Sequence, residues 1–311
     1  MDCIHTVRAL QARADAERAA GKRIALVPTM GALHAGHASL FDLARKRADR
    51  VWVSIFVNPT QFDDPRDLAA YPRTLESDLA VCREAGVDLV FVPDAAEMYP
   101  AGAQTTVEVG ALAAPLCGAS RPGHFRGVAT VVTKLLCAAK PHVAVFGEKD
   151  YQQLAVIRQL ARDLLLDVEI AGAPTVREPD GLALSSRNRH LDTDARRQAV
   201  ALVRALDAAE AAVAAGERDV ERVRALVRAE LAAAPRAEID YAELRDPVAL
   251  APAPARLAGP TLLALAVFVR PTSEGGRTVR LIDNRVLHPQ AQVSRSEPKA
   301  SEDYKTEGAA S

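Results

Sequence analysis

The chain has 311 residues, of which 49% are hydrophobic and 25% charged. The composition is typical of a globular protein, and the length suggests two domains. Its formal net charge of −1 gives no general attraction for nucleic acid or for an anionic membrane, and we expect neither as a partner. No window approaches the ~20 apolar residues of a membrane span, and residues 1–23 do not have the character of a signal peptide. Cys3, Cys82, Cys117 and Cys137 show no metal-ligand spacing, which predicts a cytoplasmic protein with reduced thiols.

Short apolar runs alternate with helical stretches in the first part of the chain. The runs that read as buried strands, each bounded by turn residues, are 23–28, 51–57, 87–93 and 142–146. Apolar residues recur at helical spacing after His37 and again after Asp150. This alternation predicts a doubly wound parallel α/β sheet over residues 1–175, whose ligands bind beyond the carboxyl ends of the strands.

The pattern changes after residues 172–188, a segment with two prolines and two glycines. Apolar helical faces then follow at 195–213 and 220–231, and strand-like runs at 238–244, 261–269 and 278–283. We therefore expect a second, smaller α+β domain over residues 176–289. The polar segment 290–311 has almost nothing to bury and is expected to be disordered.

The segment PTMGALHAGH, residues 28–37, directly follows a predicted strand, and a helical pattern begins inside it. A helix start presents unpaired N–H groups and a partial positive charge of about +0.5, and so can bind phosphate. His34 and His37 are three residues apart, so both imidazoles are expected on one face of the first turn. Gly31 and Gly36 allow a ligand to approach the backbone. The alternative is two surface histidines that happen to begin a helix; the position after a strand favours a phosphate site.

A second segment, GEKDYQQ at residues 147–153, also lies at a strand-to-helix junction. Lys149 offers a point charge for phosphate oxygens. Asp150 and Gln153 also fit a capping-box pattern, in which both side chains would serve the local helix. The sequence leaves two possibilities open: the pair acts only as a cap, or Asp150 also holds a ribose or a phosphate-bound water.

Two further segments have patterns that are common by themselves and point to a binding site only together with the first two. LALSSRN, residues 182–188, combines two hydroxyl groups with Arg187 and suits a mobile loop that closes over polyphosphate. Ser-Ser-Arg is by itself common in loops. FVNPTQF, residues 56–62, places Asn58 and Gln61 where a parallel sheet usually binds its substrate. A simple Asn-Pro turn would give the same pattern.

Taken in order, these segments and two others resemble the signature segments of the pantothenate synthetase family. The full set is PTMGALHAGH, VNPTQF, RPGHFRGVATVV, FGEKDYQQL, VREPDGLALSSRN and RLIDN, which spans roughly residues 20–288. H-x-G-H alone is shared by many nucleotidyl-transferring α/β proteins, whereas six ordered segments are highly specific. Two departures are visible: the turn at 271–276 is longer than expected for the family, and the tail after about residue 290 is additional.

The resemblance implies a Rossmann-like amino-terminal domain, a smaller carboxy-terminal lid domain and a homodimer. The implied reaction joins pantoate to β-alanine at the expense of ATP, through a pantoyl-adenylate intermediate, and releases AMP and pyrophosphate. The implied metal is Mg²⁺, bound mainly through the ATP phosphates, with no protein ligand assigned.

The resemblance also implies which residues form the site. The implied ATP-binding residues are Met30, Gly31, Ala32, Leu33, His34, Ala35, Gly36, His37, Gly147, Glu148, Lys149, Asp150, Val176, Leu184, Ser185, Ser186 and Arg187. Gln61 and Gln153 are implied to hold pantoate, with Gln61 also near β-alanine, and we add Asn58 from its position after the strand. His37 is the implied proton donor. We assign catalysis to His34, His37, Lys149 and Arg187, because adenylation needs groups that stabilise charge on the transferring phosphate and the departing pyrophosphate.

Three other functions fit parts of the pattern. A nucleotidylyltransferase acting on a phosphorylated metabolite would use the same H-x-G-H, but its acceptor site calls for more arginine and lysine than Asn58, Gln61 and Gln153 supply. An aminoacyl-tRNA synthetase fragment would need a basic RNA-binding domain. A non-catalytic nucleotide sensor would bind ATP without turnover, and this leaves the convergence of four charge-bearing groups unexplained.

Overall fold

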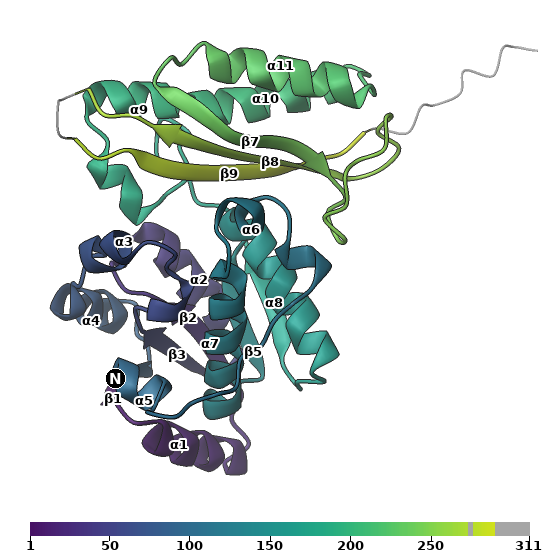
Figure 1. The fold of residues 1–311 in the computed structure, drawn as a ribbon. Helices are drawn as coiled ribbons and strands as arrows, with labels where there is room; N and C mark the ends of the chain where they lie inside the picture. The colour runs from purple at the N-terminus through teal and green to yellow at the C-terminus, as the bar shows by residue number, and fades with distance from the viewer. Residues whose placement is uncertain (273–275, 290–311) are drawn as a thin grey trace, which may run out of the picture.

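A computed structural model, which describes residues 1–272 and 276–289, builds the chain around two separate sheets (Figure 1). The larger sheet is parallel and six-stranded, in the order β1-β4-β3-β2-β5-β6. Its strands are β1 (Asp2–Ile4), β2 (Ile24–Thr29), β3 (Arg50–Ile55), β4 (Leu89–Phe91), β5 (Val143–Gly147) and β6 (Glu169–Ala173). The chain moves from β2 to β3 in one direction and later continues from β5 to β6 in the other. The strand order therefore reverses between β2 and β5, which is where a doubly wound sheet binds its ligand.

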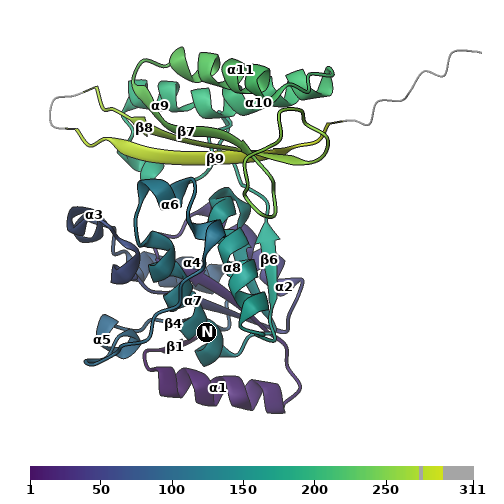
Figure 2. The ribbon, with the colours of Figure 1, turned by 45° about the vertical axis from the view of Figure 1, so that its right-hand side comes forward.

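Helices cover both faces of this sheet (Figures 1 and 2). The helices of this unit are α1 (Val7–Ala19), α2 (Ala35–Arg45), α3 (Pro65–Ala70), α4 (Leu75–Glu84), α5 (Ala95–Met98), α6 (Cys117–Ser120), α7 (His124–Ala139) and α8 (Tyr151–Asp163). Successive residues of β2 point to opposite faces, because side chains alternate along a strand. Ile24 and Leu26 pack in the core beneath α1, α7 and α8, whereas Ala25 and Val27 pack beneath α2 and α4. The doubly wound α/β prediction is confirmed.

The smaller sheet is antiparallel, in the order β7 (Ala237–Arg245), β8 (Thr261–Val269) and β9 (Val279–Leu287). Its outer face is covered by α9 (Thr193–Ala199), α10 (Ala201–Ala214) and α11 (Val220–Ala232), which share one apolar core with it. Its other face lies over the first unit, above α6 and α8 (Figure 1). Residues 195–213 were expected as one continuous helical face. The structure divides this stretch into α9 and α10, which meet at Val200 (ψ −15°), and the apolar residues of both helices pack together in the core as expected.

Two side chains of β9 connect this smaller sheet to the segments that follow the larger one. Asp283, only 2% exposed, accepts hydrogen bonds from both terminal nitrogens of Arg177, at 2.7 and 3.0 Å. The side-chain amide of Asn284 donates to the carbonyl oxygens of Glu148 and Lys149, each at 2.9 Å. These contacts fix the position of the second unit relative to the carboxyl end of β5.

Some expectations fall where the structure gives no description. The predicted disordered tail, residues 290–311, and residues 273–275 of the longer turn lie outside the described residues. Within residues 1–272 and 276–289, no helix is both long and apolar enough to cross a membrane.

Candidate active site

The segment after β2 forms a tight loop before α2. Gly31 has a φ of +78°, in the left-handed region, and Ala32 follows with a φ of +53°. The buried carboxylate of Asp78, in α4, accepts hydrogen bonds from the Ala32 N–H at 3.0 Å and the Leu33 N–H at 2.8 Å. A side chain at Gly31 would approach an Asp78 oxygen to 2.8 Å. Asp78 therefore holds the loop from outside the segment, in a role that the sequence pattern did not indicate.

The two histidines of H-x-G-H cap α2. The Gly36 N–H donates to Nδ1 of His34 at 3.1 Å, and the His34 N–H donates to Nδ1 of His37 at 3.2 Å. Because each Nδ1 accepts a hydrogen bond, the neutral rings carry their own hydrogen on Nε2. Both rings therefore offer Nε2–H as a hydrogen-bond donor. Their centroids are 4.2 Å apart.

Electrostatics keep these rings neutral. Burial, and then the neighbouring His34, lower the pKa of His37 from 6.5 to about 3. Burial, and then the charge of Lys149, also lower the pKa of His34. In the absence of a ligand, His37 is thus a neutral hydrogen-bond donor. Gly36 preserves this arrangement, because a side chain there would lie 2.9 Å from the His34 ring.

The segment after β5 forms a short 3₁₀ turn, Glu148–Asp150, before α8. Asp150 occupies the N-cap position of α8 but makes no side-chain capping hydrogen bond. The capping-box interpretation of Asp150 and Gln153 is therefore wrong, and the exposed Asp150 carboxylate accepts no hydrogen bond from any described residue. The reason is that Asp150 has a φ of −93° and a ψ of 59°, outside the extended conformation that a side-chain cap needs.

The segment between the two sheets forms a hairpin-like turn. The Leu184 N–H donates to the Val176 carbonyl at 2.9 Å, so these two predicted residues lie side by side. Beyond the turn, the Ser185 hydroxyl accepts from the Arg187 N–H at 3.2 Å and caps the short turn Ser186–His190. Buried Asn188 donates to Glu178 at 2.6 Å and anchors this turn. The Arg187 side chain is exposed and forms no ion pair within the described residues.

Asn58 was expected to contact the substrate, but its side chain is buried and bonded to other protein groups. Its side chain is only 1% exposed, and its amide group donates to the Gln61 side chain at 3.0 Å and to the Gly127 carbonyl at 3.2 Å. Its oxygen accepts from Thr60 and from the Tyr99 hydroxyl. Because these contacts use both its donor and its acceptor atoms, Asn58 orients Gln61 instead of offering a free group to a ligand. Gln61 also contacts the sulfur of Met30 at 3.1 Å.

A cavity of about 250 Å³ collects residues from all of these segments. The predicted site residues that line it are Met30, His34, Gly36, His37, Asn58, Gln61, Gly147, Lys149, Asp150, Gln153, Val176, Leu184, Ser185, Ser186 and Arg187. The predicted residues that do not line it are Gly31, Ala32, Leu33, Ala35 and Glu148. Gly31, Ala32 and Leu33 belong to the loop that Asp78 holds.

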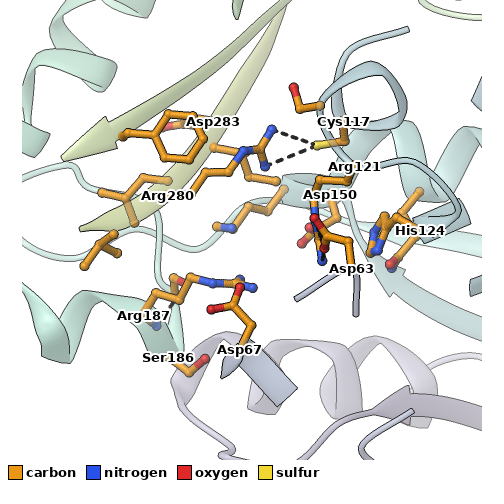
Figure 3. A pocket seen from close by; sticks show the side chains of 18 of the residues that line it. Asp63, Asp67, Cys117, Arg121, His124, Asp150, Ser186, Arg187, Arg280 and Asp283 are labelled. Carbon is orange, nitrogen blue, oxygen red and sulfur yellow. Dashed lines mark hydrogen bonds and ion pairs between the residues drawn. The ribbon is translucent and has the colours of Figure 1, made fainter. Parts of the chain in front are cut away.

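The cavity opens into a larger cleft of about 900 Å³ beneath the antiparallel sheet. The two share the residues Tyr71, Lys149, Asp150, Gln153, Ser185, Ser186 and Arg187. Arg280 of β9 lies on one side of the cleft, opposite Asp63, Arg121 and His124 (Figure 3). The cleft thus combines groups from both structural units.

Several residues of the site were not assigned a role from the sequence. One wall of the inner cavity is apolar and is formed by Val128, Val131, Val132 and Leu135 of α7. Tyr71 lies where the two cavities meet, and Arg121 and His124 line the outer cleft. The segment RPGHFRGVATVV carries most of these residues, so the signal was present in the sequence without a local pattern that revealed its chemistry.

The fold and the cleft place this chain among the doubly wound α/β proteins, which bind their ligands beyond the carboxyl ends of a parallel sheet. The family model described as pantoate-beta-alanine ligase matches residues 2–286, and the chain belongs to this family. It is 55% identical to the pantothenate synthetase of Syntrophobacter fumaroxidans, over 94% of this chain and 100% of that one. Its identity to the pantothenate synthetase of Geobacter sulfurreducens is 53%, over 92% and 99% of the two chains.

Solved structures of the same family are also similar to this chain. The crystal structure of pantothenate synthetase from Thermus thermophilus has a TM-score of 0.85 and 43% identity, and the match covers 93% of this chain and 100% of that one. The Francisella tularensis pantoate-beta-alanine ligase, complexed with beta-gamma ATP and beta-alanine, has a TM-score of 0.73 and 34% identity, over 92% and 97% of the chains.

Proposed function

We propose that this chain is an ATP-dependent ligase that joins pantoate to β-alanine and releases AMP and pyrophosphate. The observation that carries the proposal is the joint presence of His37, Lys149 and Arg187 around one cavity, although they come from three separate segments. Gln61 and Gln153 line the same cavity and supply polar amide groups. An anionic nucleotide and a hydroxy acid can therefore bind next to each other. The names of the relatives and of the solved structures agree with this assignment.

In the first step, a pantoate carboxylate oxygen attacks the α-phosphorus of ATP, and the bond to the bridging oxygen of pyrophosphate breaks. This reaction needs no enzyme nucleophile, because the protein contributes by positioning the reactants and stabilising charge. The Nε2–H groups of His34 and His37 donate to the phosphate oxygens that gain charge. Lys149 and Arg187, which form no ion pair within the described residues, neutralise the transferring group.

Pantoate binds on the inner side of the cavity. Its two methyl groups pack against the apolar wall of α7, and its hydroxyl and carboxylate oxygens face the amides of Gln61 and Gln153. Gln61 is held for this task by Asn58, which donates to its side-chain oxygen, and the Gln61 nitrogen donates one hydrogen to the Met30 sulfur and keeps a second for a ligand oxygen. We therefore assign Asn58 a positioning role.

The second step is attack of the β-alanine amine on the carbonyl carbon of pantoyl adenylate, with AMP as the leaving group. Water would hydrolyse this mixed anhydride, so the site must be covered during the reaction. We propose that residues 1–175 bind ATP and pantoate, and that residues 176–289 act as the lid. The support is that β9 and the turn at Ser185–Arg187 both contribute to the lining of the cleft.

Magnesium fits the site as a partner of the triphosphate. Among residues 1–272 and 276–289 there is no group of three or more metal-ligating side chains, so the phosphates would supply most of its ligands. Asp150, with its unpaired carboxylate, would hold a water of the ion's shell. When bound, the ion neutralises the outer phosphates.

We also propose a homodimer in the cytoplasm. The dimer follows from the family, and the compartment from the four cysteines, all of which are free thiols.

The proposal is tested by incubating the purified protein with ATP, magnesium, pantoate and β-alanine and identifying the products by mass spectrometry. We expect pantothenate and AMP in equal amounts. A dinucleotide formed from ATP and a phosphorylated acceptor would instead indicate a nucleotidylyltransferase. ATP binding with no turnover would indicate a nucleotide sensor.

A further inference from the structure

His124, the first residue of α7, has the opposite hydrogen-bonding polarity from His34 and His37. Its Nδ1 lies 2.8 Å from the carbonyl oxygen of Gln61. A carbonyl oxygen can only accept, so Nδ1 carries the hydrogen and donates it. In the neutral ring, Nε2 is then left with a lone pair. The site thus contains two histidines that donate through Nε2 and one that accepts through Nε2.

The free nitrogen of His124 is accessible from the cleft. His124 lines the 900 Å³ cleft and lies beside Asp63 and Asp150 (Figure 3). Nε2 forms no hydrogen bond with any described residue, yet it is not among the buried polar atoms of that part of the chain that lack a partner. The atom is therefore open to the cavity, where a ligand can reach it.

We infer that His124 binds the attacking amine of β-alanine and accepts its proton as the amide bond forms. This inference rests on the proposed function, because it concerns the second step of that reaction. The amine nitrogen, in its NH₂ form, bonds to the carbonyl carbon of pantoyl adenylate. The bond between that carbon and the AMP oxygen breaks, and AMP leaves with the electron pair. One amine proton moves to Nε2 of His124 and then to solvent.

Three features of the surroundings support this role. Burial, and then the charge of Arg121, lower the pKa of His124 from 6.5 to about 4, so the lone pair is present at neutral pH. The hydrogen bond to the Gln61 carbonyl fixes the ring next to a residue that we propose to face the carboxyl group of pantoate. Arg121 and Arg280 line the same cleft in ion pairs with Asp63 and Asp240, and Arg187, which forms no ion pair within the described residues, is placed to bind the carboxylate at the other end of the amine.

The decisive variant is His124→Asn. The asparagine nitrogen occupies the place of Nδ1 and keeps the hydrogen bond to Gln61, but nothing replaces Nε2. Two half-reactions are measured: pantoate-dependent exchange of labelled pyrophosphate into ATP, and single-turnover reaction of enzyme-bound pantoyl adenylate with β-alanine. We expect the single-turnover rate to fall by at least about 10², while exchange changes by less than about threefold.

Controls separate this idea from its alternatives. His288→Asn changes an exposed histidine that lines neither cavity and should leave both half-reactions unchanged. His124→Ala also loses the contact to Gln61, so it should weaken pantoate binding in addition. Equal losses in both half-reactions of His124→Asn would reduce His124 to a support for Gln61. No loss in the second half-reaction would overturn the inference. Absence of exchange in the unmodified protein would instead contradict the proposed function itself.

Discussion

Asn284 reaches from the antiparallel sheet to the main chain of Lys149, whose carbonyl oxygen accepts a hydrogen bond from the Asn284 side chain at 2.9 Å. The same amide nitrogen also donates to the Glu148 carbonyl at 2.9 Å. A residue of the second structural unit thereby holds the turn that presents the proposed phosphate-binding lysine. We therefore expect the position of Lys149 to depend on the docking of the second unit.

Asn284→Asp should therefore lower turnover more than stability. A carboxylate oxygen facing two carbonyl oxygens would repel them and displace Lys149, and a displacement of ~1 Å can cost about 10²-fold in rate. Steady-state kcat and the thermal midpoint are the quantities to compare. Arg285→Gln is the matched control, because this neighbour on β9 pairs outward with Asp207 and Glu210 of α10. Unchanged kcat in Asn284→Asp would show that the turn holds its position unaided.

Gly127→Ala should displace the pantoate site. A Cβ at this position of α7 would lie 2.2 Å from the Thr60 carbonyl oxygen and 2.7 Å from Cα of Gln61. Overpacking of this kind typically costs about 1–3 kcal/mol of folding stability. We expect the KM for pantoate to rise more than the KM for ATP. Gly259→Ala, where an added Cβ meets no atom within 4 Å, is the control. A similar rise of both constants would argue against a local effect on Gln61.

His37→Asn and Lys149→Met test the phosphate-binding assignment. Asparagine keeps an acceptor for the His34 N–H but removes Nε2–H, and methionine keeps the length of lysine without its charge. Losing one transition-state donor commonly lowers turnover by about 10²–10³, and we expect losses of at least this size in each variant, with the fold intact by circular dichroism. Lys46 is exposed, and Lys46→Met is the control that should leave turnover unchanged. Near-normal turnover in both site variants would remove these residues from the mechanism.

Stability should decrease as the pH falls from about 6.5 to 4. The pKa values of His37 and His124 are lowered from 6.5 to about 3 and about 4. The unfolded chain therefore binds more protons in this window, and the free energy of unfolding decreases with falling pH, by up to about 1.4 kcal/mol per pH unit for each histidine. Urea denaturation across the window measures the slope. The double variant His37→Asn/His124→Asn should flatten it, and an unchanged slope would mean that other groups dominate.

The sequence predicted the strands at the centre of the larger sheet and the helices that follow His37 and Asp150, because these elements have strong local periodicity. It missed β1 and β6. Asp2–Ile4 is too short to alternate, and Glu169–Ala173 contains small residues with little preference for a strand. Both strands form because they add to the edges of an existing sheet.

At the site, too, the sequence could not predict features that depend on residues far apart in the chain. Residues within one segment could be grouped by spacing, but the contact from Asn284 to Lys149 joins positions 135 apart in the chain. Asp78 supports the loop after β2 from a helix 45 or more residues away. The polarity of His124 depends on which nitrogen meets the Gln61 carbonyl, and this follows from packing of α7 and not from any motif.

The account is tested most directly by exchange of labelled pyrophosphate into ATP in the presence of pantoate and magnesium, without β-alanine. If His37, Lys149 and Arg187 surround one triphosphate while pantoate attacks its α-phosphorus, label should enter ATP only when pantoate is present. Release of ADP and inorganic phosphate in place of exchange would mean attack at the γ-phosphorus, and the proposed adenylation would then be contradicted.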